Sequence, residues 1–110
     1  MADFTRKELQ QIIAVAKPVN LRGADLSVLD LSRLDLSQAN LSLADLSFTQ
    51  LIDTNLIKAR LMGANLQDAN LINTNLQGAD LRYADLRKAN IEKADLREAD
   101  LRGANLVNLD

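Results

Sequence analysis

The chain of 110 residues contains 13 Lys and Arg against 15 Asp and Glu, with no Cys and no His. This length suits a single domain. The lack of Cys and His excludes disulfides, the usual zinc sites, a thiol nucleophile and an imidazole base. A net charge of −2 argues against sequence-independent binding of nucleic acid, because such binding needs an excess of positive charge along the phosphates.

Hydropathy along the chain indicates no membrane-spanning segment. No unbroken apolar run approaches the roughly 20 residues that span a bilayer. The N-terminal stretch MADFTRKELQ also lacks the apolar core of a secretory signal. The sequence therefore favours a cytoplasmic protein, and a mature form that has already lost a leader would show the same pattern.

The first residues carry the signals of a helix N-terminus. Thr5 and Glu8 have the spacing of a capping box, in which each side chain bonds the backbone of the other. Phe4 precedes the cap and Leu9 lies one turn inside, which is the arrangement of a hydrophobic staple. We therefore expect a helix to begin at about residue 6.

An apolar stripe and a proline define the rest of this N-terminal unit, residues 1–18. Pro18 disfavours helical backbone at Lys17, so the predicted helix covers about residues 6–17. Its apolar stripe consists of Leu9, Ile12, Ile13 and Ala16. We expect this stripe to cover the first part of the repeat that follows. The alternative is a helix that binds a membrane surface or a partner.

A five-residue repeat organises the remainder of the chain. From Val19 onward a Leu recurs at every fifth position through eighteen pentads, with Ile91 as the one exception. Two residues before it lies a small or apolar residue, which is Ala in twelve pentads. Between them lies Asp or Asn in sixteen, the exceptions being Gln50 and Arg60. The repeating unit is A-[D/N]-L-x-x.

A period of five fits neither a helix nor a continuous strand. Successive leucines would step by about 140° around a helix, and they would alternate between the two faces of a strand. Short extended pieces with Ala and Leu on one face solve the problem, provided that the last two residues of each pentad turn the chain. Four glycines at the fifth position, together with Asp and Asn at corners, favour such turns. These glycines are Gly23, Gly63, Gly78 and Gly103. The sequence predicts an all-β solenoid filled with leucine.

Residues 19–108 resemble the pentapeptide-repeat family, whose motif is this A-[D/N]-L-x-x. The resemblance implies a right-handed quadrilateral β-helix in which four pentads make one coil, with about 4.5 coils in residues 19–110. Spacing alone does not distinguish a square coil from a triangular one. Because each coil contacts only its neighbours, the ends need covers, and we expect the N-terminal helix to be one. The family is abundant in bacteria, especially cyanobacteria.

No catalytic site is expected. The many carboxylates occupy the outward slot of the repeat, and a filled solenoid offers no water-poor pocket in which their pKa would shift. Thr49, Thr54 and Thr74 occupy the inward slot, where we expect small core residues rather than nucleophiles. The sequence therefore predicts no enzyme activity, no cofactor and no metal.

Outward apolar residues are the better indication of function. We expect a scaffold that binds an unidentified protein partner through an apolar strip on the second and third coils. The alternative is that stacked aliphatic side chains merely stabilise neighbouring coils. The residues of this candidate protein-binding face are Phe48, Ile52, Ile57, Met62 and Ile72.

A second class of function follows from the resemblance. Some family members resemble duplex DNA in shape and charge, inhibit DNA gyrase and protect it from quinolones. This chain is nearly neutral, and its last coils mix arginines and lysines among the acids, which makes a poor mimic of phosphates. DNA mimicry is therefore the alternative function here, and direct binding of nucleic acid is not expected.

The C-terminal end of the solenoid is the last candidate site. Leu101, Leu106 and Leu109 are expected at that end beside unpaired backbone, which favours self-association. We expect a weak end-to-end dimer through this coil. In the alternative, the last half-coil frays and Leu109 folds back over the core.

Overall fold

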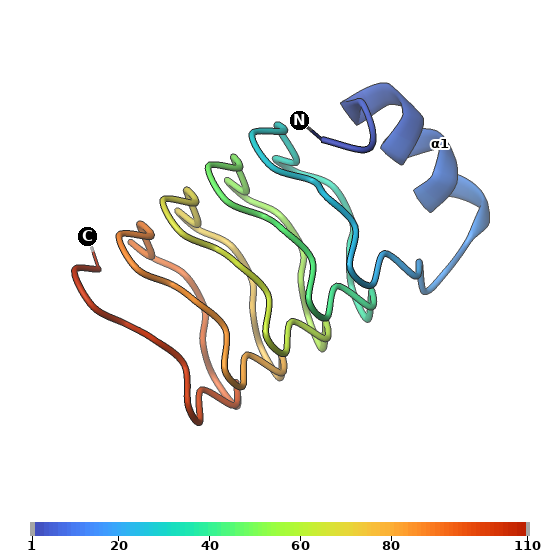
Figure 1. Cartoon of the computed structure of the whole chain (residues 1–110). Coiled ribbons are helices and arrows are strands. Elements are labelled where there is room, and N and C mark those ends of the chain that lie inside the picture. The colour runs from blue at the N-terminus through green and yellow to red at the C-terminus, as the bar shows by residue number, and fades with distance from the viewer. Residues whose placement is uncertain (1, 110) are drawn as a thin grey trace.

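The structure is a computed structural model that describes residues 2–109. Met1 and Asp110, at the outer ends of the expected units 1–18 and 19–110, lie outside the described residues. The described chain begins with one helix, α1 (Arg6–Val15), and continues as a stack of coils with the helix at one end (Figure 1). Its β-structure consists of isolated bridges rather than longer strands.

The bridges fix the register of the coils. Each of the fourteen bridges described within residues 2–109 is parallel and joins a residue to the one twenty positions later, from Asn20 with Asn40 to Asp85 with Asn105. A coil therefore contains twenty residues, or four pentads. The four pentads of a coil form its four sides. The first, second, third and fourth sides are those whose central residues in the first coil are Leu21, Leu26, Leu31 and Leu36, in that order.

Leucine side chains fill the interior of the stack. Leu66, in the middle coil, is 0% exposed, and the Ala two residues before it is equally buried. Burial of one leucine contributes about 2 kcal/mol. The three inward threonines are also buried, and their hydroxyls donate to backbone carbonyls at 2.6–2.9 Å. They are core residues, as the sequence predicts.

The fifth position of every pentad has left-handed backbone. Among residues 2–109, all eighteen such positions have φ between 57° and 74°, and fourteen of them are not glycine. Left-handed backbone costs an ordinary residue about 1–2 kcal/mol. Val28, at φ 69°, is the most demanding case because its side chain is β-branched.

The Asp or Asn of the repeat stabilises the same corner. In sixteen pentads of the described chain its side-chain oxygen accepts a hydrogen bond from the N–H two residues later, as Asn65 does from Gln67 at 3.0 Å. These bonds turn the chain locally. The two pentads without one are those with Gln50 and Arg60. This confirms the corner role predicted for Asp and Asn.

Helix α1 begins as the sequence predicts and ends earlier. Thr5 accepts from the N–H of Glu8 at 3.1 Å, and Glu8 accepts from the N–H of Thr5 at 2.9 Å. The prediction of residues 6–17 is wrong at its end, because Ala16 already has extended backbone and terminates the helix after Val15. Pro18 restricts only Lys17, so the extended backbone of Ala16 is a feature that the sequence does not indicate.

The helix packs on the first coil. Leu9 and Ile13 are buried in the same core as the leucines of the coils, and Phe4 and Ile12 pack against it while half-exposed. Ala16 is half-buried at the end of the stripe. The apolar stripe thus faces the solenoid.

Candidate protein-binding surfaces

The register distributes the five outward apolar residues over several sides of the coil. Ile52 and Ile72 lie on the third side in neighbouring coils, and Phe48 occupies the corner where the third side begins. Ile57 lies on the fourth side and Met62 on the first. The structure therefore brings Ile52 and Ile72 to one side, places Phe48 at the corner that adjoins it, and separates the other two. We call Phe48, Ile52 and Ile72 the third-side patch.

Within this patch, exposure differs from one position to the next. The side chain of Phe48 is 57% exposed, whereas Ile52 and Ile72 are half-buried. The backbone beneath pairs with that of the neighbouring coil, since Gln50 and Asn70 form a bridge and the side-chain amide of Asn70 donates to that of Gln50 at 3.2 Å. The patch thus presents one exposed and two half-buried apolar side chains on paired coils.

Two other exposed apolar residues are explained by the glycines beside them. The side chain of Leu43 lies over Gly63 in the next coil, 2.7 Å from where a Cβ would be, and the ring of Tyr83 covers Gly103 in the same way. Both glycines also have positive φ. Leu43 and Tyr83 therefore shield backbone that has no side chain of its own.

On the last two coils, four arginines form bidentate hydrogen bonds with aspartates. Arg82, Arg87, Arg97 and Arg102 each donate from two guanidinium nitrogens to the Asp two residues earlier, at 2.6–3.2 Å. The hydrogen bonds from Arg102 lower the pKa of Asp100 to about 2. Arg82 in turn lies 3.9 Å from Asp100 in the adjoining coil. These acids are therefore neutralised locally.

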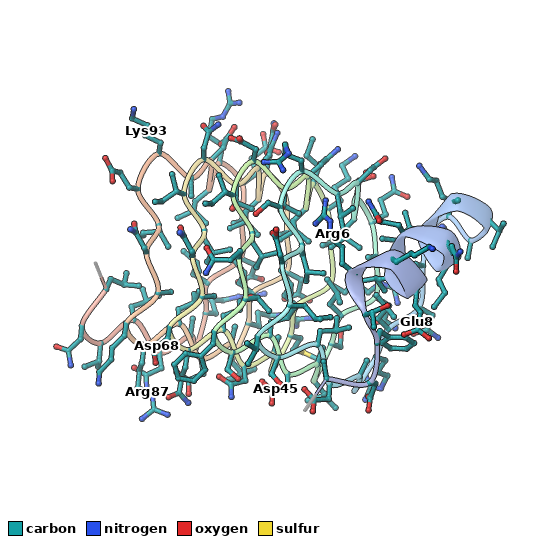
Figure 2. All side chains as sticks on the ribbon, turned by 90° about the horizontal axis from the view of Figure 1, so that it is seen from above. Arg6, Glu8, Asp45, Asp68, Arg87 and Lys93 are labelled. Carbon is teal, nitrogen blue, oxygen red and sulfur yellow. The ribbon has the colours of Figure 1, made fainter. Side chains whose placement is uncertain are left out.

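Serines take the place of these arginines in the first coils. The hydroxyls of Ser27 and Ser37 donate to Asp25 and Asp35 at 2.6 and 2.7 Å, and this bond is the main cause of the lowered pKa of each carboxyl. Figure 2 shows Asp45, Asp68 and Arg87 along one edge of the stack, with Lys93 on the opposite edge. Within residues 2–109, charges of both signs thus lie on the surface without a continuous acidic row.

At the N-terminal edge of the first coil, Arg6 and Asp3 form hydrogen bonds with backbone groups that have no preceding coil. Arg6 points from α1 toward the coil (Figure 2) and donates to the carbonyl oxygens of Asp30 and Ser32 at 2.7 and 2.9 Å. In later coils the same carbonyl positions accept from backbone N–H groups of the preceding coil. The carboxylate of Asp3 accepts from the N–H of Asp25 at 2.7 Å, and the backbone N–H of Asp3 donates to the carbonyl of Asp25 at 2.6 Å. No feature of the sequence marks these roles, because the partners are 22–26 residues away.

At the opposite end, the described chain leaves an apolar hollow. Leu101 and Leu109 are half-buried beside it, and Leu106 is 43% exposed. The structure thus brings together the three residues of the candidate dimer end. The hollow is lined by Leu76, Leu81, Leu86, Ile91, Leu96, Leu101, Leu106 and Leu109.

Other kinds of site find no support in the described chain. Within residues 2–109, no three His, Cys, Asp or Glu side chains gather so as to hold a metal ion. No helix of these residues combines the length and the apolar character needed to cross a membrane.

The repeat matches a known family model. Eight copies of a model described as pentapeptide repeats match residues 20–56, 59–97 and 79–110. The chain belongs to the pentapeptide-repeat family. No curated protein matches it significantly.

Solved structures of pentapeptide-repeat proteins resemble the chain. Rfr23 from the cyanobacterium Cyanothece 51142 is 47% identical with a TM-score of 0.83, and the match covers 86% of this chain and 65% of Rfr23. HetL from the cyanobacterium Nostoc sp. strain PCC 7120, involved in regulation of heterocyst differentiation, is 31% identical with a TM-score of 0.40, over 84% of this chain and 55% of HetL. This pentapeptide-repeat chain thus spans less than two thirds of either relative.

QnrB1, a plasmid-mediated fluoroquinolone resistance protein, has a more distant likeness. A trypsin-treated M102R form is 18% identical with a TM-score of 0.55, over 84% of this chain and 53% of that chain. At this identity the likeness concerns the fold alone.

Proposed function

We propose that this pentapeptide-repeat protein is a non-catalytic scaffold, a right-handed quadrilateral β-helix whose third side binds another protein. The observation that carries the proposal is the column of Ile52 and Ile72, two outward aliphatic side chains in neighbouring coils, with the exposed Phe48 at the corner that adjoins their side. Because leucine fills the interior, we expect a partner to bind on the surface. Exposed aromatic side chains with neighbouring aliphatic ones are typical anchors of protein interfaces.

The partner we expect is a protein with an apolar surface flanked by hydrogen-bonding groups. The third side carries Gln50 and Asn70 beside the isoleucines, and charged groups occur mainly in its first and last coils, as Asp30 and Glu92. Such a polar rim around an apolar centre suits a protein interface.

A photo-crosslinking experiment tests the third-side patch. A crosslinking residue replaces Phe48 in the full chain, and a second variant carries it in place of Tyr83 at the corner between the first and second sides. In extract from the native host, we expect a discrete crosslinked protein from position 48 and none from position 83. Ile52→Ser with Ile72→Ser should abolish the crosslink while the chain remains folded by circular dichroism.

The matched control is Met62→Ser on the first side, which removes a half-buried apolar side chain from the same coil as Ile72. It should leave the crosslink intact. Crosslinks that persist in the double variant, or that Met62→Ser removes equally, would show that the third side is not the binding surface.

The C-terminal hollow supports a second proposal, a weak end-to-end dimer. The observation in its favour is a lining made wholly of Leu and Ile beside the exposed Leu106. Light scattering over a concentration series should show a dimer at high micromolar protein. Leu106→Lys with Leu109→Lys should restore the monomer, and a dimer unaffected by this double change would leave the folded-back Leu109 as the better account.

A further inference from the structure

The four sides of the coil differ in charge. The first side carries four outward arginines and two aspartates, although the whole chain has a net charge of −2. Each of the other three sides carries more acids than bases within residues 2–109. The first side is therefore the positive side of a slightly acidic molecule. Its charged residues are Arg22, Arg60, Arg82, Arg102, Asp80 and Asp100.

In the first three coils, the basic residues around this side have no acidic partner. Arg22 and Arg60 are exposed on the first side, and Lys58 is exposed at the corner where that side begins. None of the ion pairs described within residues 2–109 involves these three side chains. The first side of these coils also contains no Asp or Glu. Its positive charge is therefore available to a partner.

An apolar side chain lies between these charges. Met62 is half-buried two residues after Arg60, and the register places it in the same column as Arg22, two coils away. A spacing of about 4.8 Å between coils puts the positions of Arg22 and Met62 roughly 10 Å apart. Both Met and Arg are enriched in protein interfaces. We call Arg22, Lys58, Arg60 and Met62 the first-side basic patch.

The fourth and fifth coils do not extend this patch. Arg82 and Arg102 continue the column of Arg22 and Met62, but each is neutralised by the Asp two residues earlier. Tyr83 lies at the next corner of the fourth coil and is therefore outside the patch. The small extent of the patch suits a short segment of a partner.

We infer that the first-side basic patch binds an acidic segment of another protein, in which carboxylates flank an apolar residue. The carboxylates pair with the two arginines and the lysine, and the apolar residue contacts Met62. Arginine suits this role because its guanidinium binds a carboxylate through two parallel hydrogen bonds. An extended nucleic acid fits less well, because it would also approach Asp25 and Asp45 on the adjoining second side. This surface is separate from the third-side patch, so each can be tested without the other.

Titration of the full chain with a synthetic acidic peptide, followed by NMR, tests this inference. The probe is a peptide with blocked ends and four glutamates around two central leucines. We expect shifts of the amide signals of Arg22, Arg60 and Met62, and binding that weakens with added salt. Arg22→Gln with Arg60→Gln should raise the dissociation constant roughly fivefold, because two exposed ion pairs are lost. A peptide with glutamines in place of its glutamates should cause no shifts at the patch.

Arg33→Gln with Lys93→Gln is the matched control, since it removes the same charge from the corners between the third and fourth sides. It should leave the dissociation constant nearly unchanged, as should Ile52→Ser with Ile72→Ser on the third side. Equal losses from the two charge variants would overturn the inference, because net charge alone would then govern binding. Absence of shifts with the acidic peptide would also overturn it. Tighter binding of a single-stranded oligonucleotide at the same amides would overturn it in favour of a nucleic-acid site.

Discussion

At the residue scale, the fold requires left-handed backbone at each corner, which most residues other than glycine disfavour. Val28 has φ 69° and is 71% exposed, so its β-branched side chain gains little packing for an unfavourable backbone. We expect Val28→Asn to stabilise the protein by about 1 kcal/mol, which corresponds to a rise in melting temperature of roughly 4 °C.

Val107 provides the matched control for this substitution, since it is an exposed valine whose backbone is not left-handed. Val107→Asn should leave the melting temperature nearly unchanged. If both substitutions had the same effect, backbone strain at the corner would not be the cause.

The lowered pKa of Asp100 predicts a loss of stability in acid. A carboxyl with a folded pKa of about 2 and an ordinary unfolded value near 4 stabilises the fold above about pH 4, and this contribution is lost as the pH falls toward 2. We expect the melting temperature of the parent to fall across this window, and that of Asp100→Asn to fall less. Equal falls in the parent and in Asp100→Asn would show that the bonds from Arg102 to Asp100 are not the source of the acid sensitivity.

Sequence reasoning worked for residues whose roles are local. The bond from Asp or Asn to an N–H two residues later depends on short-range geometry, so its role at corners could be predicted. The left-handed backbone was visible only where the sequence has glycine, and Val28 gives no such signal. Lys58 and Glu98, with φ of 57° and 63°, show that the coil imposes this backbone whatever the side chain.

At the scale of elements, the start of α1 and the side that its apolar stripe covers were predictable, and its polar contacts were not. The capping box of Thr5 and Glu8 is a local motif, whereas the bonds from Arg6 to the carbonyls of Asp30 and Ser32 join residues that only the folded coil brings together. The early end of α1 at Val15 was not predictable either, because Pro18 restricts only the residue before it.

Arg6 tests the role of this helix as a cap. Because its planar guanidinium bonds two carbonyls at once, we expect Arg6→Lys to lower the free energy of unfolding by about 1 kcal/mol or more despite the retained charge. Chemical denaturation measures the change. Lys7→Ala, at an exposed position of the same helix turn, should have little effect, and equal losses from both would assign the effect to the helix rather than to the bonds from Arg6.

At the scale of the whole molecule, the five-residue period predicted a leucine-filled solenoid but not the number of sides. The resemblance to the pentapeptide-repeat family supplied four, and bridges between residues twenty apart confirm it, and with it the side on which each outward residue lies. This register separates Met62 and Ile57 from Ile52 and Ile72, which a list of outward positions could not do. A surface can be assigned in this family only after the coil length is known.

The charge distribution of the molecule argues against DNA mimicry. A mimic needs unpaired acidic rows, but Asp80, Asp85, Asp95 and Asp100 are each held by an arginine two residues later, and the net charge is only −2. We therefore expect no inhibition of gyrase supercoiling by this protein at micromolar concentration. A variant with Gln in place of Arg82, Arg87, Arg97 and Arg102 frees the four carboxylates on the same fold, and any inhibition should appear with that variant alone. Potent inhibition by the parent would show instead that shape suffices for mimicry, and the DNA-mimic function would then take precedence over the third-side scaffold.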